Sequence, residues 1–306
     1  MTGLALARDY WEAVGKPAFA ARCPAVLERA AVGLAGEGSE CFGFDDAVSR
    51  DHDWGPGFCI WLSAGDLRSL GAEAQAVYAS LPQEFQGLRR LRVGPETAHR
   101  VGVQCISDFY YRFLGRETPP QSAAEWRGIP ESGLATAVNG AVFQDPTGEF
   151  SAFRSALLAY YPEELRRKKL AKALALAAQA GQYNFPRCLR RDEPVAAFSA
   201  LAEFVTELEQ AVFLLNRRYA PYYKWTHRAL CGLPILGREL GPELAALTEE
   251  PDRRIERIEA ISARVIGELR RQGLSRSGSD FLLDHAIDLQ SRITDPLLSR
   301  LHLMAE

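Results

Sequence analysis

A polar stretch between two apolar runs, residues 38–55, constrains the fold of this chain more than any other feature. The run before it, residues 30–34, and the run after it, residues 58–62, have the length and the side chains of buried strands. Glycines, serines and acidic residues fill the stretch between them. The pattern therefore predicts a polar connection that leads from one buried strand into another.

Two acidic residues of this stretch, Asp51 and Asp53, stand two positions apart at the expected start of the second strand. Alternate side chains of a strand share a face, so the carboxylates are expected roughly 6.5–7 Å apart on one side. Oxygen ligands of this kind suit Mg²⁺, which keeps its other positions for water and phosphate. We therefore expect these two residues to hold Mg²⁺, or Mn²⁺ in its place, whereas Asp45 and Asp46 are expected to be loop or cap acids.

Composition restricts the class of protein. The chain has 306 residues, of which 47% are hydrophobic, and this length predicts two domains with a sizeable core. The net charge of −3 gives no general attraction to nucleic acid or membrane. No apolar run approaches the roughly 20 residues that span a bilayer, and residues 1–11 lack a signal-peptide core. We expect a soluble cytoplasmic protein with no membrane partner and with reduced cysteines.

Strand and helix patterns mix in the first half of the chain. Helical periodicity is expected over residues 4–15 and 17–31 and in the segment that Asp66 can cap, while residues 116–133 have a loop composition. Residues 101–106 alternate as a strand, and a short aromatic helix, 108–114, follows them. Asn139-Gly140 between two β-compatible runs, 134–138 and 141–144, predicts a hairpin with a type I′ turn.

From residue 149 onward the sequence shows helical stripes and no good strand. This change predicts two domains, residues 1–148 and residues 149–306. The fold class is therefore α+β: a mixed sheet with flanking helices, followed by an all-helical C-terminal domain. Within the second domain, the basic run 166–169 is expected to be a solvated helix face.

The polar stretch resembles a motif of the DNA polymerase β-like nucleotidyltransferase superfamily. The matching positions are Gly38-Ser39, Gly43, Ser49, Asp51 and Asp53. The resemblance implies that Gly38, Ser39 and Ser49 lie at the nucleotide and that the paired acids hold the metal ions. Residues 45–55, 183–187 and 216–225 are also similar to an uncharacterised bacterial domain-of-unknown-function family. That similarity implies a helical second domain like that of aminoglycoside nucleotidyltransferases, with the active site between the domains.

The superfamily carries a third catalytic acid on a later strand. In this chain the order of elements matches the third acid to Gln104. A glutamine cannot act as a carboxylate base, and it is a weaker, neutral metal ligand. Asp51, Asp53 and Gln104 are thus the candidate catalytic positions, and Gln104 raises the alternative of a nucleotide-binding or regulatory protein with weak or no transfer.

A second constellation, residues 216–228, mixes basic and aromatic side chains around Pro221. Such a mixture can clamp a triphosphate and stack on a base, and it also suits a packed interface. Lys224, Arg218 and Tyr223 are the strongest candidates for nucleotide contact.

The expected activity is transfer of a nucleoside monophosphate, AMP from MgATP, to a hydroxyl. The acceptor stays open among a small molecule, a protein side chain and an RNA end, as does the question of a homodimer. A structural or partner-binding helical protein, in which the Asp-x-Asp pair is incidental, is the remaining alternative.

Overall fold

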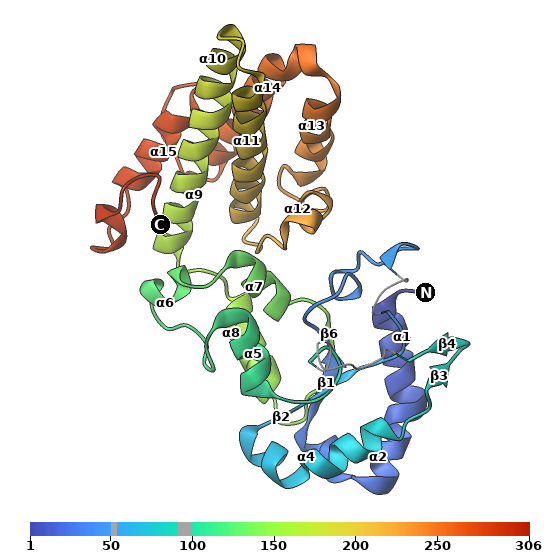
Figure 1. Ribbon diagram of the computed structural model, residues 1–306. Coiled ribbons are helices and arrows are strands. Elements are labelled where there is room, and N and C mark those ends of the chain that lie inside the picture. Colours follow the sequence, from blue (N-terminus) through green and yellow to red (C-terminus); the bar gives the residue numbers. More distant parts are fainter. Residues whose placement is uncertain (50–53, 91–98) are drawn as a thin grey trace. The chain divides into compact units, whose positions relative to one another are not determined.

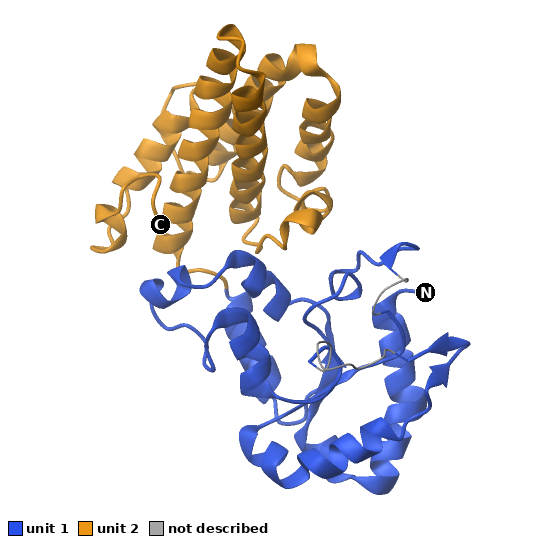
Figure 2. Ribbon diagram, in the orientation of Figure 1, with its two compact units in different colours: residues 1–159 blue, residues 160–306 orange. Residues whose placement is uncertain are grey.

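The computed structural model describes residues 1–49, 54–90 and 99–306 (Figure 1). The chain divides into two compact units, residues 1–159 and 160–306 (Figure 2). The sequence-based boundary after residue 148 falls at the start of helix α8 (Glu149–Leu158), which belongs to the first unit. None of the described helices is long and apolar enough to cross a membrane.

A four-stranded mixed sheet forms the centre of the first unit, with strand order β5-β2-β1-β6. Strand β1 runs antiparallel to β2 and β6, and β2 runs parallel to β5. Every residue of β1 and β2 is buried, as their apolar sequences predict. The strands are β1 (Ala31–Leu34), β2 (Cys59–Leu62), β5 (Gly102–Cys105) and β6 (Ala141–Gln144).

Helices flank this sheet, so the predicted α+β class is confirmed. A small hairpin of β3 (Glu84–Phe85) and β4 (Leu88–Arg89) completes the described strands. The helices of this unit, besides α8, are α1 (Gly3–Tyr10), a π-helical segment (Trp11–Gly15), α2 (Lys16–Arg22), α3 (Ala25–Arg29), a 3-10 helix (Glu40–Phe42), α4 (Ala64–Ala79), α5 (Ile106–Leu114), α6 (Ala123–Arg127) and α7 (Glu131–Ala137).

Aromatic packing fixes α5 and α8 against the sheet. The Trp61 ring of β2 stacks on Phe150 of α8, with centroids 4.1 Å apart, and meets Phe109 of α5 edge-on at 5.3 Å. Gly33 of β1 makes room for the indole, because a Cβ there would lie 3.0 Å from the Trp61 ring and 2.3 Å from the Ala141 carbonyl oxygen. These buried rings give the first unit much of its apolar core.

The predicted hairpin at Asn139-Gly140 is wrong. Residues 131–137 form helix α7, and β6 pairs with β1 instead of with the residues that precede the turn. Leu134 and Ala137 are buried on one side of α7, so their apolar character served a helix. The expected loop at 116–133 likewise contains α6 and the start of α7.

The second unit is helical throughout, and all of its residues, 160–306, are described. This confirms the predicted helical C-terminal region. Helix α9 packs against α11 and α15 (Figure 1). The helices are α9 (Glu163–Ala177), a π-helical segment (Ala178–Asn184), α10 (Phe185–Arg190), α11 (Pro194–Leu215), α12 (Tyr223–Leu230), α13 (Gly237–Glu249), a 3-10 helix (Pro251–Arg253), α14 (Arg254–Arg271), α15 (Leu282–Ser291) and a second 3-10 helix (Leu298–Arg300).

Three residues of the basic run on α9, Arg166, Lys168 and Lys169, are buried and Arg167 is partly exposed, so its prediction as a solvated face is wrong. Lys168 is fully buried, and its ammonium group donates hydrogen bonds to the carbonyl oxygens of His302 and Leu303, each at 2.9 Å. Lys169 forms an ion pair with Glu306. The cations lie inside because α9 is central and the irregular segment after α15 needs donors for its carbonyl groups.

Replacing Lys168 by Met is expected to lower the free energy of unfolding by about 3 kcal/mol, because two carbonyl groups lose a charged donor. Urea denaturation measures the loss. Lys172→Met is the matched control, since Lys172 is a third exposed and makes one 3.5 Å contact with Glu306; its cost should stay below about 1 kcal/mol. Equal losses for the two variants would contradict the proposed role of Lys168.

Candidate functional site at the edge of the sheet

The ends of four strands meet at one edge of the sheet. The last residues of β1 lie beside the first residues of β2 and β6, because Gly33 pairs with Cys59 and Leu34 with Ala141. Strand β5 begins beside β2, where Cys59 pairs with Gly102. The segments 35–43, 99–101 and 139–140 therefore converge here, and we call this region the glycine-rich edge.

Glycines shape the loop after β1. Gly36 and Gly38 have φ angles of +109° and +119°, which side chains disfavour. At Gly38 a Cβ would also lie 2.5 Å from the Arg100 guanidinium and from the Glu40 carboxylate. The backbone N–H groups of residues 37–39 donate no hydrogen bond within the described part of the chain. The loop thus presents consecutive donors of the kind that bind anions.

Asn139 holds this loop in place. Its amide oxygen accepts a hydrogen bond from the Gly36 N–H at 2.8 Å, and its amide nitrogen donates to the Gly36 carbonyl at 2.7 Å. Arg154 of α8 donates to the Asn139 carbonyl at 2.7 Å, and the Gly140 N–H donates to the Cys41 carbonyl at 2.8 Å. Gly140 tolerates this approach because its φ is +65° and a Cβ there would meet the backbone of β1. The Asn139-Gly140 pair therefore acts as a clamp that joins the start of β6 to the loop after β1.

The two predicted serines differ in their surroundings. The Ser39 hydroxyl makes no hydrogen bond among the described residues, while its carbonyl accepts from the Phe44 N–H at 2.8 Å. The Ser49 hydroxyl is engaged with Asp46, whose N–H donates to it at 2.7 Å. Asp45 accepts a hydrogen bond from the Gly3 N–H at the start of α1, at 2.8 Å. Asp45 and Asp46 are thus cap and loop acids, as predicted.

Charged side chains that the sequence motif did not predict surround the loop after β1. Arg100 pairs with Glu40 at 2.9 Å, and each side chain is only 11% exposed. His99 lies 2.7 Å from the Glu37 carboxylate. Arg112 of α5 donates to the His99 carbonyl at 3.1 Å, and burial lowers the pKa of this arginine. One indication of this cluster was present in the sequence, because Arg100 stands directly before the predicted strand 101–106.

Gln104, the expected third-acid position, lies buried on β5. Its amide nitrogen donates to the Cys59 sulfur at 3.6 Å, and its oxygen accepts from Arg112 at 3.4 Å. The Cys59 thiol lies 3.2 Å from the Arg100 carbonyl, to which it donates; burial raises its pKa to about 12. The sulfur can then only accept from its other neighbour, so an amide, which both donates and accepts, suits position 104.

The expected metal ligands, Asp51 and Asp53, lie outside the described residues. Within residues 1–49, 54–90 and 99–306, no group of three histidine, cysteine or acidic side chains is arranged to hold a metal ion. The metal assignment therefore stays a prediction from the sequence.

The second constellation forms an exposed surface on the helical unit. Tyr223 is 77% exposed, and its ring centroid lies 4.4 Å from that of Tyr222. The Lys224 ammonium lies 5.3 Å from the centroid of the Trp225 ring. Arg218 is exposed, and its carbonyl accepts a hydrogen bond from the Tyr160 hydroxyl at 3.2 Å. We call Arg218, Tyr222, Tyr223, Lys224 and Trp225 the aromatic–cationic surface.

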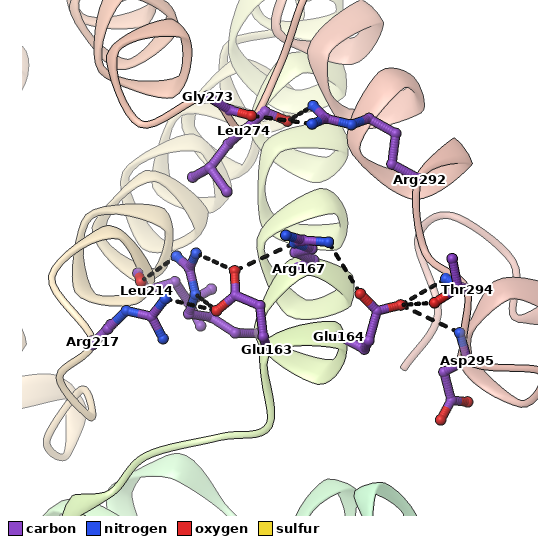
Figure 3. A network of polar contacts seen from close by, with 11 residues as sticks. Glu163, Glu164, Arg167, Leu214, Arg217, Gly273, Leu274, Arg292, Thr294 and Asp295 are labelled. Atoms are coloured by element: carbon purple, nitrogen blue, oxygen red, sulfur yellow. Dashed lines mark hydrogen bonds and ion pairs between the residues drawn. The ribbon is translucent and has the colours of Figure 1, made fainter.

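Arg217, by contrast, is bound into a structural network at the start of α9 (Figure 3). Its guanidinium pairs with Glu163 at 2.7 Å, and Arg166 binds the same carboxylate at 2.7 Å. Burial favours the neutral acid, but the hydrogen bonds and charges of Arg166 and Arg217 outweigh it and lower the pKa of Glu163 to about 2. Glu164 accepts from the Thr294 N–H at 2.6 Å, which ties α9 to the segment after α15.

Comparison with known proteins adds one finding. Residues 126–226 match the family described as a domain of unknown function, DUF4037. The matched region includes Asn139 of the clamp, includes Arg154, which donates to the Asn139 carbonyl, and runs through Trp225 of the second constellation. No curated protein sequence matches the chain. Over this third of its length the chain is therefore similar to an uncharacterised family.

Asn139→Ala is expected to cost about 2 kcal/mol of unfolding free energy, because it leaves the Gly36 N–H and carbonyl without their side-chain partner. Urea denaturation measures the change in the free energy of unfolding. Amide hydrogen exchange at residue 36 reports local opening of the loop after β1. Asn184→Ala is the control, since no hydrogen bond of that side chain is described; it should cost no more than about 0.5 kcal/mol. An unchanged exchange rate at residue 36 would argue against the clamp.

The Glu163 network predicts a pH dependence. The carboxyl pKa is about 2 in the folded chain against an ordinary 4.5. The network therefore stabilises the fold fully above pH 4.5, and this contribution is lost as the pH falls toward about 2. Urea midpoints measured through this window should fall more steeply for the wild type than for Glu163→Gln. Glu203→Gln, an exposed change on α11, should keep the wild-type slope; parallel curves for all three proteins would refute the assignment.

Proposed function

We propose that the protein binds a nucleoside triphosphate at the glycine-rich edge, with ATP and Mg²⁺ as the expected ligands. The observation that carries the proposal is the loop after β1, in which the N–H groups of residues 37–39 are without partners in the described chain. Gly38 lets a phosphate approach the backbone, and Ser39 adds a hydroxyl. Arg100 supplies positive charge beside them, at hydrogen-bond distance from Glu40.

Asp51 and Asp53 would hold Mg²⁺, or Mn²⁺, in this proposal. The donor set fits such an ion, because carboxylate oxygens are its preferred ligands. Asp45 caps α1 through its Oδ2 atom, and its buried Oδ1 atom, in the same connection between β1 and β2, has no hydrogen-bond partner among the described residues, so this oxygen would be open to the ion as well. A bound ion would neutralise phosphate charge and orient the reacting groups.

The reaction we propose is transfer of a nucleoside monophosphate to a hydroxyl, as in the nucleotidyltransferase superfamily that the motif resembles. The α-phosphorus would form a bond to the acceptor oxygen as its bond to pyrophosphate breaks, and the hydroxyl proton would go to a base. The net charge of −3 disfavours a long nucleic-acid track as acceptor. A small molecule, a protein side chain and an RNA end remain the acceptor classes.

Gln104 supports a second candidate, a nucleotide-binding or regulatory protein without turnover. Its oxygen is hydrogen-bonded to Arg112, and its amide supplies no base. Both candidates share nucleotide binding, and they differ only in whether the bound nucleotide reacts.

Arg218, Tyr223 and Lys224 of the aromatic–cationic surface are proposed to contact nucleotide as well. An exposed tyrosine can stack on a base, and the two exposed cations can pair with phosphate. Ser49 is a weaker candidate than Ser39, because its hydroxyl is already bonded to Asp46.

Calorimetry with MgATP tests the binding proposal. Asp51→Asn should weaken affinity by about tenfold or more, and Lys224→Ala by a similar factor, because each loses a charged contact. Asp9→Asn and Lys172→Ala, on α1 and α9, are charge-matched controls and should bind as the wild type does. If Asp51→Asn leaves the affinity untouched, the metal assignment is wrong; if the wild type binds no nucleotide, a purely structural protein is favoured.

Incubation with nucleotides labelled at the α-phosphate separates the two binding candidates. Pyrophosphate release with a pool of small molecules, proteins or RNA supports transfer. Release by Gln104→Glu but not by the wild type would support the placement of the third acid. Binding without release in every pool favours the regulatory candidate.

A further inference from the structure

Three side chains outside the glycine-rich edge form an acid–base–thiol series. The Glu209 carboxylate of α11 lies 3.0 Å from Nδ1 of His227 on α12. The other ring nitrogen, Nε2, lies 3.8 Å from the sulfur of Cys231, one turn further along. Glu209 is buried, His227 is partly exposed and Cys231 is exposed. The series therefore runs from the interior of the second unit to its surface.

The order of contacts fixes the chemistry of the ring. A carboxylate only accepts, so Nδ1 carries the proton that Glu209 binds, and Nε2 is left with a lone pair toward the thiol. The acid and the sulfur touch opposite nitrogens, so the three groups cannot ligate one metal ion together. They match instead the arrangement in which an acid orients a base beside a nucleophile.

Burial sets the charges in this series. Burial raises the pKa of Glu209, and the hydrogen bond and positive charge of His227 act against that rise. The charged form of the buried carboxylate is therefore stabilised when the imidazole takes up a proton. Partial burial and the Glu209 charge raise the pKa of Cys231. This raised pKa keeps Cys231 in its thiol form, so the thiol proton must move during the attack.

Access distinguishes Cys231 from the other cysteines. Cys23, Cys41, Cys59 and Cys105 are buried, and Cys188 is half-buried. Gly241 of α13 leaves the space that the sulfur occupies, because a Cβ there would lie 2.6 Å from it. The exposed Cys231 sulfur therefore packs on one side against the backbone of α13.

The surroundings select the kind of reaction. The N–H groups of Cys231, Gly232 and Leu233 are hydrogen-bonded to carbonyl oxygens of α12, at 2.9–3.1 Å. No donor among them is left for an oxyanion, so acyl transfer has no support. Exchange with a disulfide needs no such donor, because its leaving group is a thiolate.

Charge selects the reagent. Lys224, Arg228 and Cys231 stand at i, i+4 and i+7, which places them on one face of α12. Both basic residues are exposed. A disulfide that carries carboxylates is therefore attracted to the thiol more strongly than a neutral one.

We propose that Cys231 is a thiol–disulfide exchange site for small anionic disulfides, with His227 as its general base and Glu209 as the residue that positions His227. The thiol proton passes to Nε2 as the Cys231 sulfur bonds to one sulfur of the reagent. The S–S bond of the reagent breaks and its other sulfur leaves as a thiolate, while the proton on Nε2 passes to water or, for a basic thiolate, to the leaving sulfur. The Cys231 sulfur is oxidised and the departing sulfur is reduced, so the exchange balances without another reactant.

The test uses the full chain with Cys188→Ser and an aromatic dicarboxylate disulfide that releases a coloured thiolate. One fast equivalent is expected, with the mixed disulfide located at Cys231 by peptide mass spectrometry. His227→Ala should slow this phase by about tenfold or more, and Glu209→Gln should slow it less. Added imidazole should restore the rate of His227→Ala and leave that of the parent unchanged, which a merely structural role would not produce.

Circular dichroism checks that the variants fold. If His227→Ala does not fold, the rate of Glu209→Gln tests the proposal in its place. A neutral hydroxyethyl disulfide should react more slowly than the anionic reagent at low salt, and high salt should remove the difference. A His227→Ala rate within about twofold of the parent, with no imidazole rescue, would overturn the role of the base. Equal salt dependence for the two reagents would overturn the charge selection.

Discussion

The hydrogen bonds between the Asn139 side chain and Gly36 join the two parts of the sheet edge on which the proposed site depends. They satisfy the N–H and the carbonyl of Gly36 together, at 2.8 and 2.7 Å. With Gly36 fixed, the loop can keep the backbone N–H groups of residues 37–39 without partners among the described residues. An anion-binding loop needs such support, because free donors would otherwise turn inward to form local hydrogen bonds.

The helical unit relies on the opposite arrangement, in which charged groups are bound by one another and by backbone carbonyl groups. Lys168 is fully buried and holds two carbonyl groups of the last segment, and the Glu163 carboxylate holds two arginines at the start of the same helix. Charges bound in this way fix the geometry of the helix ends, and a displacement of the buried Lys168 leaves a charged group unpaired. Lys224 and Arg228 of α12 differ, because both side chains are exposed at the surface of the unit.

Sequence reasoning recovered the features that depend on short-range pattern. Strands β1, β2 and β5 and the helical second unit follow from apolar runs and helical stripes. Contacts between distant residues were not predictable: Lys168 meets carbonyl groups more than 130 positions away, and Glu209 lies 18 positions from His227. The Asn139-Gly140 pair shows the same limit. The positive φ of Gly140 allows a close approach to the backbone of β1 and does not form a hairpin turn. The paired acids of the motif stay a prediction.

Amide hydrogen exchange with and without MgATP tests the central claim most directly. If the glycine-rich edge binds the phosphates, the amides of residues 37–39 should exchange more slowly with nucleotide present, because they gain acceptors. The amides at the start of β5 should follow, since Arg100 lies beside this loop. Unchanged exchange in the loop at a saturating nucleotide concentration, with protection elsewhere or nowhere, would contradict the account.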